Sequence, residues 1–220
     1  KNVEQIEYMT SDNKRLVGYR YKAHNGRGEK VKPKGYLLMA LGNAMISDQI
    51  IKYLRPFAQA GYDVYIYDYR GYGNSEGNRR INAFIEDYKE LSVFLNASYD
   101  RSVFYGISLG GVIILNVIGS GIDFDAAVID SSPSRLSNYG CPETIDSVKN
   151  LPSDSSKLMV ITGAKDKVLN ESMTKGLREE AKLKGARTLI GEQFAHPFMD
   201  SREIRKARFK IIMQFLFDRG

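Results

Sequence analysis

Hydrophobic and polar residues alternate in the first part of the chain and then give way to continuous apolar runs. Residues 3–9 and 15–22 alternate, with Ser11-Asp12-Asn13 between them, which predicts a β-hairpin. Residues 36–41 are wholly apolar, as expected of a strand that is covered on both faces. Residues 62–68 are predicted to form the next strand.

Apolar residues at helical spacing lie between these strands and continue to the end of the chain. Further strands are predicted near residues 103–105, 126–130, 158–162 and 187–191, and helices over 47–60, 82–97, 112–118, 171–184 and 202–218. Strands that alternate with helices predict an α/β fold, with a mostly parallel eight-stranded sheet flanked by helices. In such a sheet the active site lies beyond the C-terminal ends of the strands.

The length and composition indicate one ordinary globular domain over residues 1–220. The chain has 220 residues, 43% hydrophobic and 26% charged, which suits one sizeable core. No apolar run approaches the length needed to span a bilayer. Cys141 is the single cysteine, which excludes an internal disulfide and says nothing about the redox compartment. The chain begins with Lys1 rather than Met, which leaves room for an N-terminal signal or anchor that has been removed. The compartment is unknown.

The formal net charge of +6 favours anionic partners such as membranes or nucleic acid. The charges are scattered, and the densest cluster lies in the last predicted helix, at Arg202, Arg205, Lys206, Arg208 and Lys210. Apolar residues interleave with this cluster, so we expect a helix with a solvated basic face. Peripheral membrane association is the second interpretation. No aromatic-basic motif supports nucleic-acid binding, which is not expected, and the oligomeric state is undefined.

A serine bracketed by glycines gives the chain its clearest chemical signal. Residues Gly106-Ile107-Ser108-Leu109-Gly110 follow a short apolar run and precede an apolar helix. A serine at such a sharp strand-to-helix turn is held clear of the backbone, and the glycines remove Cβ clashes. Ser108 is therefore the predicted nucleophile.

A serine hydroxyl needs a general base, and histidine is the usual one. The chain has two histidines. His24 lies in a polar, glycine-rich stretch, and we expect it in an exposed loop. His196 follows the last predicted strand, where catalytic loops of this architecture lie, so it is the predicted base.

The third member of a triad is a carboxylate that orients the imidazole. Asp166 comes directly after the predicted strand 158–162 and is the leading candidate, with Asp130, at the end of the preceding strand, as its rival. Asp200 is expected to cap the final helix. The order Ser108, Asp166, His196 is the order that nucleophile-elbow hydrolases use.

Two backbone N–H groups are expected to stabilise the oxyanion that forms when an acyl carbon is attacked. One is predicted at Leu109, immediately after the serine. The other is predicted in the loop after the third strand, where Gly42 permits a turn; Asn43 is the leading donor and Ala44 the next.

Together these motifs resemble the α/β-hydrolase superfamily over essentially the whole chain. Residues 67–77, Tyr-Asp-Tyr-Arg-Gly-Tyr-Gly-Asn-Ser-Glu-Gly, look like the superfamily's D-x-R-G-x-G-x-S-x-G loop. Gly42-Asn43-Ala44 is similar to the oxyanion segment of the Bem46-like and ABHD17-like serine hydrolases. The resemblance implies hydrolysis of esters, thioesters or amides through an acyl-enzyme, with no metal and no organic cofactor. One departure is Leu41, where such enzymes commonly have histidine; we expect activity to survive, because a backbone donor does not need that side chain.

The stretch 132–157, where this fold commonly carries a lid, leaves room only for a short lid segment. We expect an open site lined by Met45, Tyr139, Phe194 and Phe198, which suits a small-molecule or lipid-like acyl substrate. The leading function is a serine hydrolase of carboxylic esters or thioesters. The alternatives are an amidase or peptidase with the same triad, and a non-catalytic binding module on this scaffold.

Overall fold

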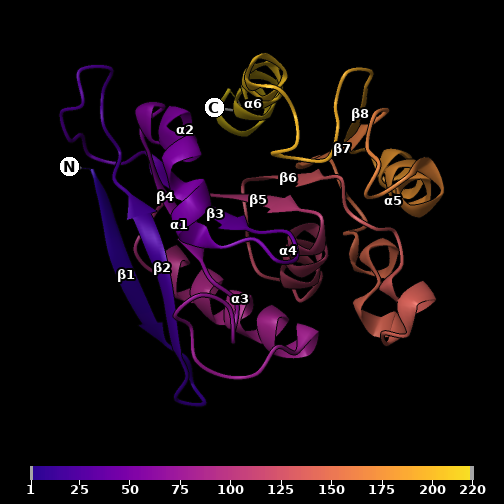
Figure 1. Ribbon diagram of the computed structural model, residues 1–220, viewed down its shortest axis with the longest axis horizontal. Helices are drawn as coiled ribbons and strands as arrows, with labels where there is room; N and C mark the ends of the chain where they lie inside the picture. Colours follow the sequence, from indigo (N-terminus) through magenta and orange to yellow (C-terminus); the bar gives the residue numbers. More distant parts are fainter. Residues whose placement is uncertain (1, 219–220) are drawn as a thin grey trace.

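Eight strands form one sheet in the computed structural model, which describes residues 2–218 (Figure 1). The strands are β1 (Val3–Met9), β2 (Arg15–Tyr21), β3 (Gly35–Ala40), β4 (Tyr62–Tyr67), β5 (Ser102–Ile107), β6 (Ala126–Asp130), β7 (Leu158–Gly163) and β8 (Arg187–Gly191). Their order across the sheet is β1-β2-β4-β3-β5-β6-β7-β8. The pairs β1–β2 and β2–β4 are antiparallel and the other neighbours are parallel, so the predicted mostly parallel sheet and its leading hairpin are confirmed.

Burial along the strands follows the pattern that the sequence predicted. Every residue of β3, β4, β5 and β6 is buried, because helices cover these strands on both faces. Strand β1 alternates between exposed and half-buried residues, as an edge strand in contact with solvent does.

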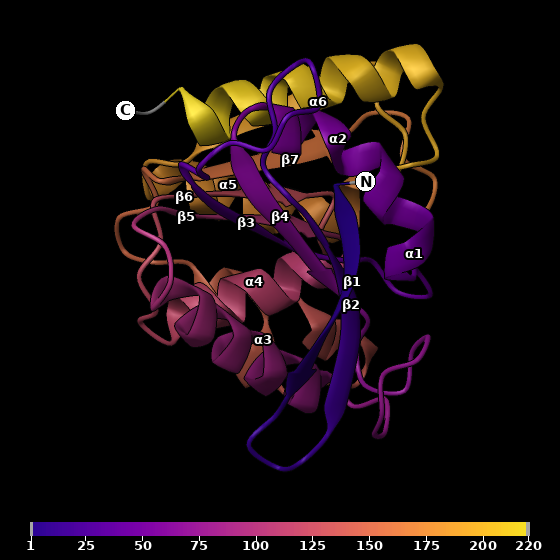
Figure 2. The same cartoon turned by 90° about the vertical axis from the view of Figure 1, so that its left-hand side faces the viewer.

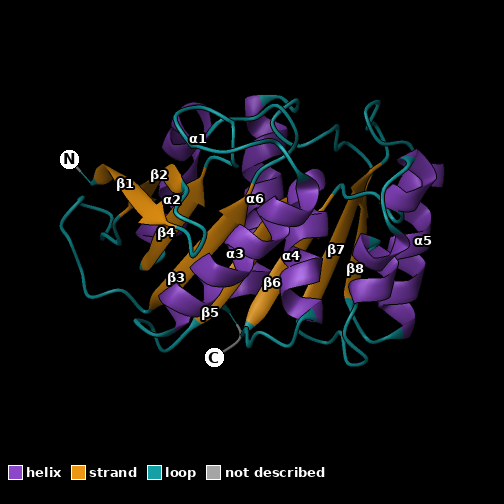
Figure 3. Ribbon diagram, turned by 90° about the horizontal axis from the view of Figure 1, so that it is seen from below, coloured by secondary structure: helices purple, strands orange, loops and turns teal. Residues whose placement is uncertain are grey.

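Helices cover both faces of the sheet (Figure 2). One face carries α1 (Ser47–Ile50), α2 (Arg55–Gln59) and α6 (Arg202–Phe217), and the other carries α3 (Ile81–Asn96), α4 (Leu109–Gly119) and α5 (Glu171–Leu183) (Figure 3). None of the helices within residues 2–218 has the length and apolar character needed to cross a membrane.

The helix predicted over residues 47–60 is interrupted. The chain forms α1, then a 3₁₀ turn over Ile51–Leu54, and then α2. Pro56 lies in the first turn of α2. Because proline has no N–H to donate to the carbonyl four residues earlier, a single continuous helix through this position is disfavoured.

The connection from β6 to β7 is short and holds no α-helix among its described residues. It forms three 3₁₀ turns, at Leu136–Tyr139, Glu143–Ile145 and Ser147–Asn150. Asp146 is fully buried beneath them and accepts hydrogen bonds from the backbone N–H and the hydroxyl of Ser137, at 2.8 and 2.7 Å. This carboxylate ties the turns into one compact segment.

Candidate active site

Ser108 lies in the tight turn between β5 and α4, at the C-terminal end of a central strand. Its backbone has φ 53° and ψ −117°, a conformation that side-chain-bearing residues rarely adopt and that costs about 1–3 kcal/mol. Two contacts hold the turn: the Ser108 N–H donates to the Asp130 carbonyl at 2.9 Å, and the Ser132 hydroxyl donates to the Ser108 carbonyl at 2.7 Å. The half-buried serine is thus fixed at the start of a helix.

The glycines around Ser108 are required by close backbone packing. A Cβ at Gly110 would overlap the Ala40 carbonyl, and a Cβ at Gly106 would lie 2.6 Å from the Gly110 carbonyl oxygen. Helix α4 therefore packs against β3 and β5 at a distance that only glycine permits.

His196 and Asp166 form a direct pair at the same edge of the sheet. The imidazole Nδ1 lies 2.7 Å from one carboxylate oxygen of Asp166, and both residues are more than 90% buried. The other carboxylate oxygen accepts the N–H groups of Val168 and Leu169 at 2.8 and 2.9 Å. Burial acts to raise the pKa of Asp166, but these hydrogen bonds outweigh it and leave the pKa below its ordinary value. Asp166 is thus an ionised partner that can hold the Nδ1 proton of His196.

Asp130, the rival carboxylate, is bound elsewhere. It is fully buried and accepts the hydroxyl of Tyr105 at 3.0 Å, and two nitrogens of Arg208 lie 3.1 Å from its two oxygens. Burial raises the pKa of Asp130, against the opposing effects of Arg208 and Tyr105. The carboxylate that contacts His196 is Asp166.

Asp200 does not cap the final helix, contrary to expectation. Ser201 is the N-cap of α6, and its side chain accepts the N–H of Ile204. Asp200 accepts the Ala195 N–H at 2.7 Å and forms an ion pair with Arg208. Asp200 therefore anchors the loop that carries His196. Its carboxylate is available for these contacts because Ser201 occupies the N-cap position of α6.

Arg208 joins the turn of Ser108 to the loop of His196. Its guanidinium contacts Asp130 and Asp200 and donates to the Ala195 carbonyl at 3.0 Å, one residue before His196. Arg208 is 1% exposed. The charge pattern of the last helix predicts a solvated face at this position, and the burial of Arg208 corrects that expectation. Within residues 2–218 there is no hydrogen bond between the Ser108 hydroxyl and the His196 imidazole, so the two side chains are brought to one edge without a direct bond.

His24 is buried rather than exposed, which also corrects the sequence-based expectation. It is 1% exposed, its ring stacks on Tyr21 with centroids 5.3 Å apart, and its Nδ1 lies 3.0 Å from the Lys22 carbonyl. Its backbone N–H donates to Ala58, so the glycine-rich loop folds back on α2 instead of extending into solvent.

The loop after β3 lies against Ser108. A Cβ at Gly42 would be 3.5 Å from the Ser108 Cβ, and Ala44 has a positive φ of 59°. Two tyrosines outside the set of predicted site residues support this loop. Tyr69 donates from its hydroxyl to the Leu41 carbonyl at 2.6 Å, and the Tyr72 hydroxyl bonds the Asn43 side-chain oxygen at 2.5 Å. Both tyrosines belong to residues 67–77. The motif in this stretch is the sequence signal by which they could have been identified.

Other residues of that motif hold the loop itself together. The Arg70 guanidinium bonds the buried carboxylate of Asp87 at 2.6 and 2.7 Å and also pairs with Asp12. Asp68 accepts the Ser47 N–H at 2.6 Å, and the Ser75 hydroxyl bonds the Asp68 carbonyl at 2.8 Å. The motif therefore shapes the protein beside the site and supplies no reacting group.

The four predicted substrate-lining residues lie in different environments. Met45 is half-buried, and its sulfur lies 3.0 Å from where a Gly42 Cβ would stand. Tyr139 is 55% exposed, and Phe198 is half-buried between the rings of Tyr53 and Phe209. Phe194 is 6% exposed and lies under the Arg208 guanidinium, 4.5 Å from the ring centroid. Because its ring packs in the core, Phe194 does not line an open surface here.

No group of three or more metal-ligating side chains occurs within the described part of the chain. The reactive groups described at this edge are the strained serine, the histidine–carboxylate pair and the first N–H groups of α4.

Known proteins resemble this chain in sequence and in fold. The model of the family described as "Serine aminopeptidase, S33" matches residues 31–143, which is half of the chain. Protein YfhR of Escherichia coli K12 is 26% identical over 137 residues, 60% of this chain and 48% of its own length. The polyketide transferase claH of Penicillium crustosum is 31% identical over 127 residues, 52% of this chain and 39% of its own length. The chain thus spans less than half the length of these curated relatives.

Two solved structures share the fold over nearly the whole chain. The esterase Pf2001 of Pyrococcus furiosus has a TM-score of 0.73 at 19% identity, with 97% of this chain and 91% of that one covered. The esterase domain of a Rhodothermus marinus protein has a TM-score of 0.72 at 17% identity, with 96% of both chains covered. At this level of identity the likeness establishes the α/β-hydrolase fold alone.

Proposed function

We propose that this chain, which belongs to the serine aminopeptidase S33 family and has the α/β-hydrolase fold, is a serine hydrolase of carboxylic esters or thioesters. Ser108 is the nucleophile, His196 the general base and Asp166 the residue that orients the base. The observation that carries the proposal is the strained Ser108 backbone, φ 53° and ψ −117°, at an edge where His196 and Asp166 are paired at 2.7 Å.

In the first half of the reaction the Ser108 oxygen attacks the acyl carbon while His196 takes its proton through Nε2. Asp166 keeps the proton on Nδ1 and stabilises the imidazolium. The N–H groups of Leu109 and Asn43 stabilise the oxyanion. When the tetrahedral intermediate collapses, His196 returns the proton to the departing alkoxide or thiolate.

In the second half a water molecule attacks the acyl-enzyme, and His196 takes the water's proton. Collapse releases a carboxylic acid and restores the Ser108 hydroxyl with the proton from His196. No step needs a metal or an organic cofactor.

The substrate is a small-molecule or lipid-like acyl compound that meets an open site beside Met45, Tyr139 and Phe198. The short segment 132–157 is the lid of a single domain over residues 1–220. Within the superfamily, Gly42-Asn43-Ala44 favours the Bem46-like and ABHD17-like branch. The esterase structures named above support ester cleavage by analogy of fold.

An amide-cleaving enzyme is the second candidate, because the matched family is described as a serine aminopeptidase. The same three residues perform either reaction, so the triad does not separate them. A panel of p-nitrophenyl esters, acyl thioesters and aminoacyl p-nitroanilides separates them by kcat/KM. We expect esters or thioesters to be preferred; preference for the anilides would favour the peptidase.

A fluorophosphonate probe tests the nucleophile directly. The native chain should be labelled and lose activity, and Ser108→Ala should not be labelled. Ser172→Ala, an exposed serine on α5, is the matched control and should be labelled like the native chain. Absence of labelling in the native chain would favour the non-catalytic binding module, and equal labelling of Ser108→Ala would show that another residue is the nucleophile.

A further inference from the structure

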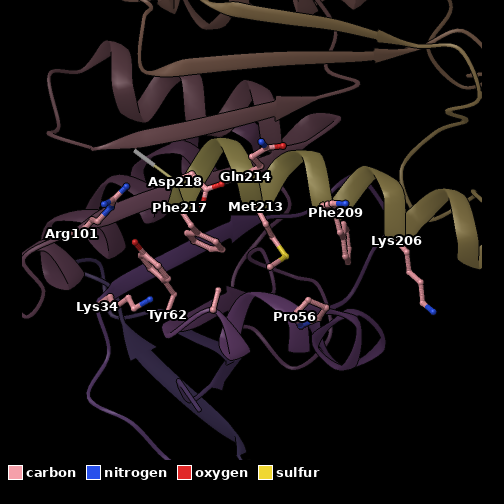
Figure 4. A pocket seen from close by; sticks show the side chains of 12 residues that line it. Lys34, Pro56, Tyr62, Arg101, Lys206, Phe209, Met213, Gln214, Phe217 and Asp218 are labelled. Carbon is pink, nitrogen blue, oxygen red and sulfur yellow. The ribbon is translucent and has the colours of Figure 1, made fainter. Parts of the chain in front are cut away.

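A cleft of about 880 Å³ lies between α6 and α2, on the face of the sheet opposite α3 and α4 (Figure 4). Its lining includes Lys34, Pro56, Ala60, Tyr62, Arg101, Lys206, Phe209, Lys210, Met213, Gln214, Phe217 and Asp218. This volume lies within the range of about 300–1,000 Å³ that small-molecule sites occupy.

The cleft is separate from the candidate active site. Lys34 and Arg101 directly precede β3 and β5, and Tyr62 begins β4. The end of the cleft that these three residues line therefore lies at the N-terminal ends of the strands. Ser108 follows the C-terminal end of β5. A ligand in the cleft would therefore leave the Ser108 edge accessible.

One end of the cleft gathers polar donors. The Tyr62 hydroxyl points toward Arg101, and Lys34 lies beside them (Figure 4). Arg101 donates through Nη2 to the Leu216 carbonyl at 3.2 Å, while its Nε is buried and has no hydrogen-bond partner. The stem of Lys34 rests on Gly61, where a Cβ would lie 3.2 Å from the lysine Cε. A guanidinium beside an ammonium group fits an anionic head group.

The middle of the cleft is apolar. The rings of Tyr62 and Phe217 are stacked with centroids 4.2 Å apart, and Met213 and Phe209 continue this surface along α6 (Figure 4). Pro56 and Ala60 of α2 form the opposite wall. An aliphatic chain laid along this surface would remove apolar area from water on both sides.

The described residues that line the cleft carry mostly positive charge. Among the lining residues that the structure describes, four are cations and one, Asp218, is an acid. Among residues 2–218, Lys34, Arg101 and Lys210 form no ion pair with a carboxylate, whereas Lys206 has the carboxylate of Glu203 nearby. An anion is therefore the complementary ligand at this surface.

We propose that the cleft binds a single-chain amphiphile with a carboxylate head, that is, a fatty-acid anion. The carboxylate binds Arg101 and Lys34, and the chain lies over Phe217 and Met213 toward Pro56. The proposal does not depend on hydrolysis at Ser108.

Calorimetric titration of the Ser108→Ala chain with dodecanoate, below its micelle concentration, tests the proposal. We expect saturable binding that Lys34→Glu and Met213→Glu each weaken about tenfold, because the first reverses a head-group charge and the second places a charge on the apolar surface. Lys182→Glu, an exposed lysine of α5, matches the charge change of the first variant and should bind like the parent. Dodecyltrimethylammonium should not bind. Equal weakening by Lys182→Glu, or binding of the cationic amphiphile, would overturn the proposal.

The position of the ligand is tested with a photoreactive diazirine fatty acid and peptide mapping. Adducts on α6 near Met213 and Phe217 are expected. Adducts confined to the loops of Gly42 and Ser108 would place the ligand in the candidate active site and overturn the proposal. Sedimentation with anionic vesicles completes the test: binding to vesicles without binding to monomeric dodecanoate would identify the surface as a membrane contact instead.

Discussion

The Arg208 guanidinium lies 3.1 Å from both carboxylate oxygens of Asp130, with both side chains out of contact with solvent. The two residues are 78 positions apart in the sequence. Through Asp200 and the Ala195 carbonyl, the same guanidinium holds the loop of His196. A buried ion network thus fixes how the histidine loop sits relative to the turn of Ser108.

Replacing Arg208 should destabilise the protein strongly. In Arg208→Met, two buried carboxylates lose their cation, and the free energy of unfolding should fall by about 3–5 kcal/mol in urea denaturation. Adding Asp130→Asn should recover part of the loss, because an amide carries no unpaired charge. Arg202→Met, at the exposed start of α6, should change stability little. A fall below about 1 kcal/mol in Arg208→Met would contradict this role.

Tyr69→Phe should weaken the loop that carries the proposed oxyanion donor. It removes the hydroxyl that binds the Leu41 carbonyl, so the free energy of unfolding should fall by about 1–2 kcal/mol. Because the loop positions Asn43, kcat for an ester should fall more than KM rises. Tyr72→Phe, whose bond is solvent-exposed, is the control and should have a smaller effect on stability. A change confined to KM would argue that Tyr69 shapes substrate binding alone.

Gly110→Ala should disturb the serine turn itself. The added Cβ would overlap the Ala40 carbonyl, and overpacking of this kind costs about 1–3 kcal/mol. Thermal unfolding and fluorophosphonate labelling should both report the change. Gly26→Ala is the matched control, because a Cβ there has no neighbour within 4 Å. If both variants are as stable as the parent, the close approach of α4 to β3 is not a constraint.

Asp166→Asn should alter activity and the response of stability to acid. The folded-state pKa of Asp166 is lowered, so its contribution to stability is present above its unfolded value, near 3.8, and is lost as pH falls through the folded value. The difference in unfolding free energy between the native chain and Asp166→Asn should therefore be larger at about pH 6 than at about pH 3. Asp100→Asn, an exposed carboxylate, should show a smaller change.

The same substitution should lower kcat by about three to four orders of magnitude, because an amide no longer holds the Nδ1 proton of His196 in the productive tautomer. Rates of ester hydrolysis measured near neutral pH test this. A loss of only a few-fold would show that Asp166 does not orient the base.

Much of the fold could be predicted from the sequence because the relevant rules act over short distances. Periodic apolar residues defined the strands, and the alternation of strands and helices defined the mostly parallel sheet. Gly106 and Gly110 marked the serine turn, since a crowded turn excludes a Cβ wherever it occurs. The break near Pro56 also follows from a local rule, because proline has no N–H to donate. The apolar residues at helical spacing on both sides of it nevertheless predicted one continuous helix.

Contacts between distant residues were decided only by the tertiary structure. Asp130 ends β6 and Asp166 follows β7, and only the packing showed that Arg208 contacts Asp130 and leaves Asp166 for His196. The Tyr69 hydroxyl bonds the Leu41 carbonyl, and the His24 N–H bonds the Ala58 carbonyl, for the same reason: each partner is supplied by another element. Periodicity and turn chemistry determined which elements form and where reactive side chains emerge. Desolvation and hydrogen-bond satisfaction across the folded chain decided which of those side chains meet.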